Sequence, residues 1–171
     1  ALAAGVRQVI FGGESFSHRP ISWKDYEEAV RLCHEAGAEI LFPTPRVVRE
    51  KYQARAQAQL RKLLTLLPDG VVLEYAGAIE WVKGEESLAV WAGPSMNIFN
   101  REAEKEIENL GFSGCFLSQE LTIPQIRYIA KGSDIPLGAY VYGRTEMMIS
   151  EYCAINAVMG DKDKKHCPMY C

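Results

Sequence analysis

Six short apolar runs alternate with helix-like stretches along this chain, and this alternation constrains the fold most. The runs are rich in the β-branched and aromatic residues typical of buried strands, and several end at glycine. A new run begins about every 20 to 35 residues, which predicts a parallel sheet with right-handed crossovers. The expected strands are 8–11, 39–43, 71–75, 88–91, 115–118 and 137–142.

Amphipathic stretches between these runs predict the helices. Ser22 and Asp25 have the spacing of a capping box, so a helix is expected to begin there. Thr122, with Pro124 in the first turn, marks the start of another helix. The expected helices are the stretch from Ser22 to near Gly37, 47–67, 78–82, 100–110 and the stretch after Thr122.

A doubly wound sheet and a (β/α) barrel both fit this pattern. No Gly-x-Gly-x-x-Gly turn follows the first strand, which argues against a dinucleotide-binding sheet. A full barrel has eight strands, and residues 1–5 resemble the end of a helix. We therefore expect an α/β fold, an incomplete TIM-like (β/α) barrel with parallel strands that lacks about one strand at each end. Residues 1–146 would form the barrel-type repeat region, and 147–171 a cysteine-bearing segment continuous with the same domain.

Composition limits the class of protein. The chain has 171 residues, of which 48% are hydrophobic and 24% charged, enough for one soluble domain with a core. A net charge of −3 argues against a general polyanion binder and leaves room for a local basic face. No run approaches the roughly 20 apolar residues of a membrane span. An odd number of cysteines and no secretory leader predict a reducing, cytoplasmic location without a membrane partner.

Polar residues gather directly after the expected strands. Barrel enzymes place their catalytic residues at these strand ends, and the guanidinium of Arg144 suits a carboxylate or phosphate. In the alternative interpretation, Asn97 and Ser118 cap the following helices, and Glu120 pairs with a surface cation. The candidate catalytic residues are Glu14, Asn97, Ser118, Glu120 and Arg144.

Three of the five cysteines lie in the last part of the chain, as Cys153, Cys167 and Cys171. Iron–sulfur clusters are commonly held by cysteine thiolates, so these three cysteines could ligate iron. Zinc is the competing metal, since His166 is adjacent, and three unrelated thiols are the remaining alternative.

The other two cysteines are expected in the core. Cys33 falls on the apolar face of a helix and Cys115 opens a buried strand, where a free thiol behaves as a small hydrophobe. His34 is expected on a helix surface or in packing. His18 follows the first strand and is a weaker candidate for the mouth of the barrel.

Motifs at several strand ends resemble those of a known family. The block from Glu146 to Cys153, with the trailing Cys-x3-Cys, is the most specific part. Together with the strand-end motifs it resembles the collagenase-like peptidases numbered thirty-two in the U series, over nearly the whole chain. The strand-end motifs are Phe11-Gly12-Gly13-Glu14, Pro94-Ser95-Met96-Asn97, Leu117-Ser118-Gln119-Glu120-Leu121 and Tyr142-Gly143-Arg144.

This resemblance implies a chemistry beyond the family's name. Several relatives hold a [4Fe–4S] cluster and hydroxylate RNA bases or a small aromatic precursor without oxygen. The resemblance thus implies that Cys153, Cys167 and Cys171 are cluster ligands, with a fourth ligand beyond residue 171. One branch has a cysteine where this chain has Gly160, so this chain resembles the branch with a wider gap.

Three functions remain open from the sequence. The first is an iron–sulfur-dependent hydroxylase of RNA or of a small aromatic acid. The second is a peptidase, although the sequence has neither a His-Glu-x-x-His motif nor a nucleophile elbow. The third is a non-catalytic binding module, because a fold alone does not determine function.

Overall fold

The computed structural model describes residues 1–13, 21–143 and 152–159. The chain forms two compact units, Ala1–Tyr140 and Val141–Cys171. The first unit contains the sheet, whose strands are β1 (Gln8–Ile10), β2 (Glu39–Pro43), β3 (Gly70–Leu73), β4 (Ala89–Ala92), β5 (Gly114–Phe116) and β6 (Leu137–Gly138).

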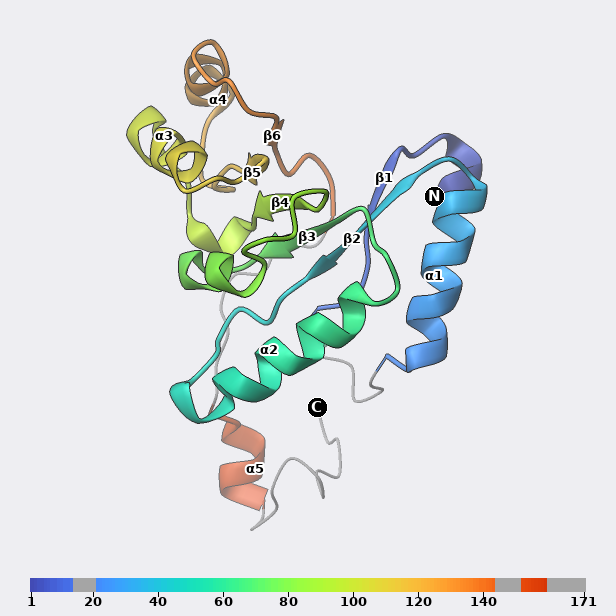
Figure 1. Ribbon diagram of the computed structural model, residues 1–171. Coiled ribbons are helices and arrows are strands. Elements are labelled where there is room, and N and C mark those ends of the chain that lie inside the picture. The colour runs from blue at the N-terminus through green and yellow to red at the C-terminus, as the bar shows by residue number, and fades with distance from the viewer. Residues whose placement is uncertain (14–20, 144–151, 160–171) are drawn as a thin grey trace. The chain divides into compact units, whose positions relative to one another are not determined.

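The six strands lie in sequential order in one sheet, and every neighbouring pair is parallel. The sheet curls from β1 to β6 as a half-barrel (Figure 1). The predicted parallel sheet and strand order are therefore confirmed. The predicted strand 137–142 was too long, because pairing with β5 ends at Gly138 and the following tyrosines are exposed.

Helices connect the strands of the first unit. The long helix is shorter than predicted, since Arg49 before it is extended and Leu67 beyond it has a left-handed backbone. The short stretch near 78–82 is a 3-10 helix. The elements are η1 (Leu2–Ala4), α1 (Trp23–Glu35), α2 (Glu50–Leu64), η2 (Ala76–Trp81), η3 (Pro94–Met96), α3 (Arg101–Asn109) and α4 (Ile123–Ala130), with α5 (Ala154–Met159) in the second unit.

Local capping explains where these helices begin. The Asp25 amide donates to Ser22 Oγ, and the Ser22 amide donates to Asp25 Oδ2 at 2.8 Å, which is the predicted capping box. These hydrogen bonds to Ser22 lower the pKa of Asp25. At the last crossover the Thr122 amide donates to Gln125 Oε1 at 2.8 Å. None of the helices in the described residues is long and apolar enough to cross a membrane.

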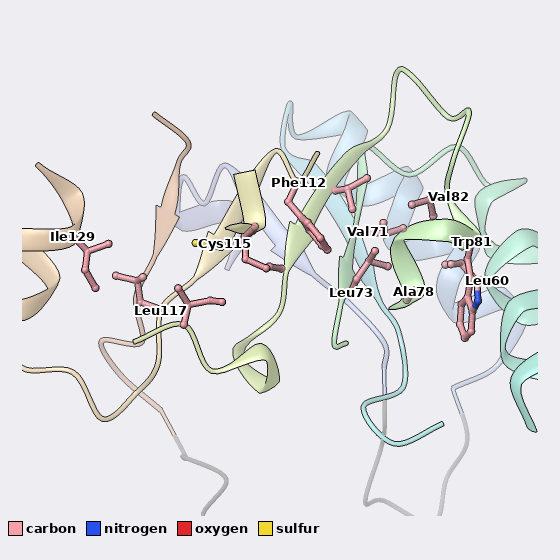
Figure 2. Packing of buried hydrophobic residues seen from close by; sticks show 14 residues of the cluster. Leu60, Val71, Leu73, Ala78, Trp81, Val82, Phe112, Cys115, Leu117 and Ile129 are labelled. Atoms are coloured by element: carbon pink, nitrogen blue, oxygen red, sulfur yellow. The ribbon is translucent and has the colours of Figure 1, made fainter. Parts of the chain in front are cut away.

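The helices pack on one face of the sheet. Successive strand residues point to opposite faces, and alternate residues of β3, β4 and β5 join the main hydrophobic cluster with Leu60 of α2, Ile107 of α3 and Ile129 of α4 (Figure 2). A second cluster joins Tyr26 and Cys33 of α1 to β2 and to Leu63 of α2. The predicted position of the helices, on the outer side alone, is thus confirmed for α1 to α4.

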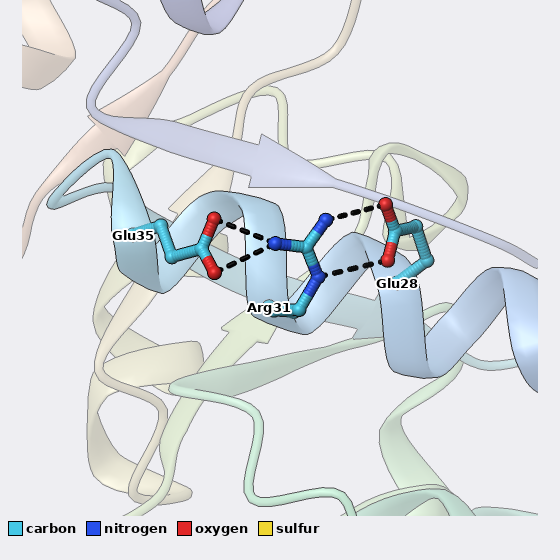
Figure 3. A network of polar contacts seen from close by, with 3 residues as sticks. All are labelled: Glu28, Arg31 and Glu35. Carbon is cyan, nitrogen blue, oxygen red and sulfur yellow. Dashed lines mark hydrogen bonds and ion pairs between the residues drawn. The ribbon is translucent and has the colours of Figure 1, made fainter.

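The solvent side of α1 carries a charged network. The Arg31 guanidinium donates to both Glu28 and Glu35, one helical turn away on either side, at 2.6 Å (Figure 3). These contacts raise the pKa of Arg31 and lower that of Glu28. All three side chains are exposed, so the network contributes little to stability.

Two cysteines belong to the core, as predicted. Cys33 and Cys115 are 3% and 0% exposed and lie in the two hydrophobic clusters. Burial raises the pKa of both thiols, and the nearby carboxylates of Asp69 and Glu104 add to the effect. The pKa of Cys115 rises from 9.0 to about 11.

This shift predicts a pH dependence of stability. The unfolded chain loses the Cys115 proton near its ordinary pKa of 9.0, whereas the folded chain keeps it to about 11. The unfolded state therefore binds fewer protons between these values, and the free energy of unfolding should fall as pH rises through this window. Urea unfolding would measure this free energy across the pH window. Its fall should be smaller in Cys115→Ala than in the wild type, and unchanged in Cys153→Ala. Identical slopes in all three proteins would contradict the buried thiol.

Candidate functional site

Three of the predicted catalytic residues lie in the described part of the chain, and each follows a strand at its carboxyl end. Asn97 follows β4, and Ser118 and Glu120 follow β5. A parallel bridge between Ile98 and Leu117, with the Ser118 amide donating to the Ile98 carbonyl at 3.0 Å, holds the two strand ends together. Of the remaining candidates, Glu14, Arg144, Cys167, Cys171 and His18 lie outside the described residues.

Asn97 and Ser118 do not cap the following helices. The N-cap of α3 is Asn100, whose Oδ1 accepts from the Ala103 amide at 2.8 Å, and α4 begins after Thr122. Asn97 has a left-handed backbone, with φ of 57°, that ends η3. Ser118 is buried and its Oγ accepts from the Glu120 amide, while Glu120 itself is exposed. Their catalytic roles remain predictions.

The structure adds a polar cluster that the sequence analysis missed. Glu74 follows β3 directly, and Ser95 follows β4. The Ser95 hydroxyl is hydrogen-bonded to Glu74 Oε2 and to its carbonyl oxygen, and the Ser95 amide donates to the same Oε2 at 3.2 Å. Thr44, after β2, accepts from the Glu74 amide at 3.0 Å. Three strand ends thus meet at half-buried Glu74: Ser95 holds its carboxylate and Thr44 its backbone.

This carboxylate lies on the sheet face opposite the helices, which we call the inner face. Its residues alternate with those of the hydrophobic clusters and share register with one another. The inner face is formed by Leu41, Gly70, Val72, Glu74, Ala89, Trp91, Gly93, Gly114, Phe116 and Gly138.

Large side chains on the inner face lie over glycines of the next strand. A Cβ on Gly114 would lie 3.0 Å from the Trp91 ring, and one on Gly138 would overlap the ring of Phe116. Leu41 covers Gly70 in the same way, and Glu74 covers Gly93, where a Cβ would lie 2.5 Å from Oε2. Each side chain leans towards the following strand, so these glycines are needed for close approach.

The sequence contained a signal for this arrangement. Glu74 is the one charged residue of the run Val71-Val72-Leu73-Glu74-Tyr75, which otherwise predicts a buried strand. The glycines of the inner face recur about one strand–helix repeat apart. Only the register of the strands shows that each glycine lies under a large side chain of the preceding strand.

The described thiols separate into two environments. Cys33 and Cys115 are buried against the helices, whereas Cys153 is exposed, directly before α5. His34 is also exposed, with Nε2 3.0 Å from Asp69 Oδ2. In the described ranges no three histidine, cysteine or acidic residues converge as a metal site.

Comparison with known proteins identifies the family. The sequence profile of peptidase family U32 matches residues 1–171. The chain belongs to this family. A curated relative, the 23S rRNA 5-hydroxycytidine C2501 synthase of Escherichia coli (strain K12), is 25% identical over 159 residues, which cover 91% of this chain. The chain spans only 24% of that relative's length.

A solved structure shows a similar fold. The U32 peptidase Mk0906 superposes with a TM-score of 0.64 at 17% sequence identity, covering 81% of this chain and 61% of that one. This likeness supports the curled parallel sheet as the fold of this chain.

The Glu74 cluster predicts a specific sensitivity at Gly93. Gly93→Ala places a Cβ against the carboxylate that Ser95 holds, so overpacking should lower the free energy of unfolding by roughly 1–3 kcal/mol. Gly77→Ala is the matched control, because its Cβ would meet Tyr75 at an ordinary 3.6 Å. Denaturant unfolding compares the two. Equal stability of both variants would show that Glu74 does not lie over Gly93.

Proposed function

We propose that this chain forms the barrel portion of an RNA-modifying enzyme of family U32, with its site at the carboxyl ends of the strands. The observation that carries the proposal is the similarity to an rRNA hydroxycytidine synthase across 91% of the chain, a stretch that includes most of the sheet. RNA is therefore the preferred substrate class, with a small aromatic acid as the alternative. A cytoplasmic location belongs to the same proposal.

The half-barrel supports an incomplete TIM-like barrel as the frame of this enzyme. Its six parallel strands are sequential and carry their helices on one face, as the strands of (β/α) barrels do. A complete barrel of this kind has eight strands. In this frame Asn97, Ser118, Glu120 and Glu74 lie at the end where barrel enzymes act, and Glu14 and Arg144 would join them from their positions after β1 and β6.

The donor chemistry of the cysteines fits an iron–sulfur cluster. Cys33 and Cys115 are committed to the core by burial, so the thiols available to a metal are Cys153, Cys167 and Cys171. Such a cluster supplies redox chemistry, which an oxygen-independent hydroxylation needs. Zinc with His166 remains the alternative for the same segment.

A peptidase is the competing function, and the described residues offer it little support. Ser95 has a carboxylate partner, but the Ser-His-Asp arrangement of serine peptidases also needs a histidine base. His34, the described histidine, pairs with Asp69 at the start of β3, the opposite end of the sheet from Ser95. The Ser95 bonds are thus better explained as orienting Glu74 than as activating a nucleophile.

The ligand assignment predicts a clear division among the cysteines. In the full-length protein reconstituted without oxygen, Cys153→Ser, Cys167→Ser and Cys171→Ser should each lower iron and sulfide content. Cys33→Ser should leave iron unchanged and lower stability, because it buries a hydroxyl in an apolar cluster. Iron and sulfide analysis measures the first effect and thermal unfolding the second. Iron content that survives all three substitutions would refute the assignment.

The activity itself is tested in cells and with purified protein. RNA from cells that lack the full-length protein should lose one hydroxylated nucleoside by mass spectrometry, and the wild-type gene should restore it. Arg144→Lys should restore it poorly, since an ammonium cannot replace the planar guanidinium fork. Unchanged RNA, together with cleavage of peptides by the purified protein, would favour the peptidase.

A further inference from the structure

We propose that the exposed face of α2 docks the phosphate backbone of RNA, beside the end of the sheet where the proposed site lies. This inference rests on the proposed RNA-modifying function and adds a second contact with the same substrate, away from the reacting base. The contact is with the charge of the backbone and selects no particular base. The charge, exposure and position of α2 support it.

The segment that contains α2 concentrates the positive charge of the chain. Between residues 46 and 62 there are six basic residues and one acidic residue, Glu50, a local charge of +5 on a chain whose net charge is −3. Two other helices lack this excess, since Arg31 of α1 pairs with Glu28 and Glu35, and α3 carries four glutamates. The basic residues are Arg46, Arg49, Lys51, Arg55, Arg61 and Lys62.

Three of these cations lie on the solvent side of the helix itself. Lys51, Arg55 and Arg61 are exposed, whereas Leu60 and Leu63 of the same helix are buried. A helix rises about 1.5 Å per residue, so the three cations cover about 15 Å of its length. The array is therefore long enough to contact several phosphates of one RNA strand.

The same three side chains are available to a ligand. In the part of the chain that the structure describes, none of them forms an ion pair. Lys62 differs, because its ammonium lies 4.5 Å from the centroid of the Trp23 ring. Cations without acidic partners attract a polyanion, and each phosphate that they neutralise releases counterions.

The position of α2 brings these cations to the catalytic end of the sheet. Ala56 and Gln59 line a small cavity together with Thr44, which directly follows β2, so the middle of α2 lies at the carboxyl end of that strand. Leu63, near the end of the helix, packs on the outer face of β2. The first turns of α2, which contain Lys51, therefore extend beyond the strand end (Figure 1).

RNA matches this surface better than a lipid membrane, the other common source of phosphate. Helices that bind membrane surfaces insert an apolar face, and the apolar side of α2, with Leu60 and Leu63, is buried in the two hydrophobic clusters. Tyr52 is 51% exposed, and its ring centroid lies 4.8 Å from Lys51 Nζ. An exposed ring beside a cation suits stacking with an unpaired base.

The test is the salt dependence of RNA binding by the full-length protein. Fluorescence anisotropy would measure the Kd of a labelled RNA hairpin from about 50 to 200 mM potassium chloride, the range over which phosphate contacts are lost. The triple variant Lys51→Gln, Arg55→Gln, Arg61→Gln should lower the slope of log Kd against log salt by about 2 to 3, since each phosphate contact contributes roughly 0.7 to 0.9. Its Kd at the lowest salt should rise roughly tenfold or more.

A matched triple variant controls for net charge. Arg7→Gln, Lys83→Gln, Lys131→Gln removes the same charge from exposed residues that come before β1, β4 and β6, at the amino ends of the strands. It should keep the wild-type slope and a Kd within about twofold, because screening weakens charges that lie far from the ligand. Circular dichroism confirms folding, and the iron content of both variants should equal that of the wild type.

The outcomes distinguish this inference from the proposed function. Equal slopes for the two triple variants would overturn the docking surface, as would an α2 variant that loses sedimentation with phosphatidylserine vesicles and keeps its RNA binding. Loss of the hydroxylated nucleoside in cells that lack the protein would then still support RNA modification, with the RNA held elsewhere. Conversely, α2-dependent RNA binding with unchanged cellular RNA would retain the surface and remove the proposed reaction.

Discussion

Close approach of large side chains to glycines determines the inner face of this sheet. Leu41 over Gly70, Trp91 over Gly114 and Phe116 over Gly138 are pairs in direct register on neighbouring parallel strands. A slip of one residue would turn every such side chain to the helix-covered face. The register, fixed by burial on the helix side, therefore also fixes which residues are presented on the inner face.

Glu74 differs from its apolar neighbours on the inner face because its side chain is charged. It covers Gly93 as the aromatic residues cover their glycines, but it brings a charge to the carboxyl end of the sheet. Ser95 and Thr44 come from the two adjacent strand ends: Ser95 donates to the carboxylate, and Thr44 accepts from the Glu74 backbone amide. The two hydrophobic clusters lie on the helix-covered face, so a polar group on the inner face does not disrupt their packing. The hydrophobic clusters and the Glu74 carboxylate thus lie on different faces of one sheet.

Periodicity and capping signals were sufficient to predict the strands, their order and the helix positions, because burial of alternate residues and local caps act within short stretches. The core roles of Cys33 and Cys115 followed from the same patterns. Glu74 was missed because the single charge in its apolar run does not identify its partners, and Thr44 and Ser95 lie far away in sequence. Contacts across strands depend on register, which periodicity does not specify. The roles of Glu14, Arg144 and the terminal cysteines stay predictions.

Ultraviolet crosslinking tests the central claim, that RNA binds at the carboxyl ends of the strands, most directly. The full-length protein would be irradiated with a single-stranded RNA, digested, and its crosslinked peptides identified by mass spectrometry. The account predicts crosslinks within 74–75, 93–99 or 117–121, which directly follow β3, β4 and β5, with Trp23 of α1 and Trp81 of η2 unmodified because they pack on the helix-covered face. Crosslinks confined to α1 to α4, with these strand ends unmodified, would contradict it.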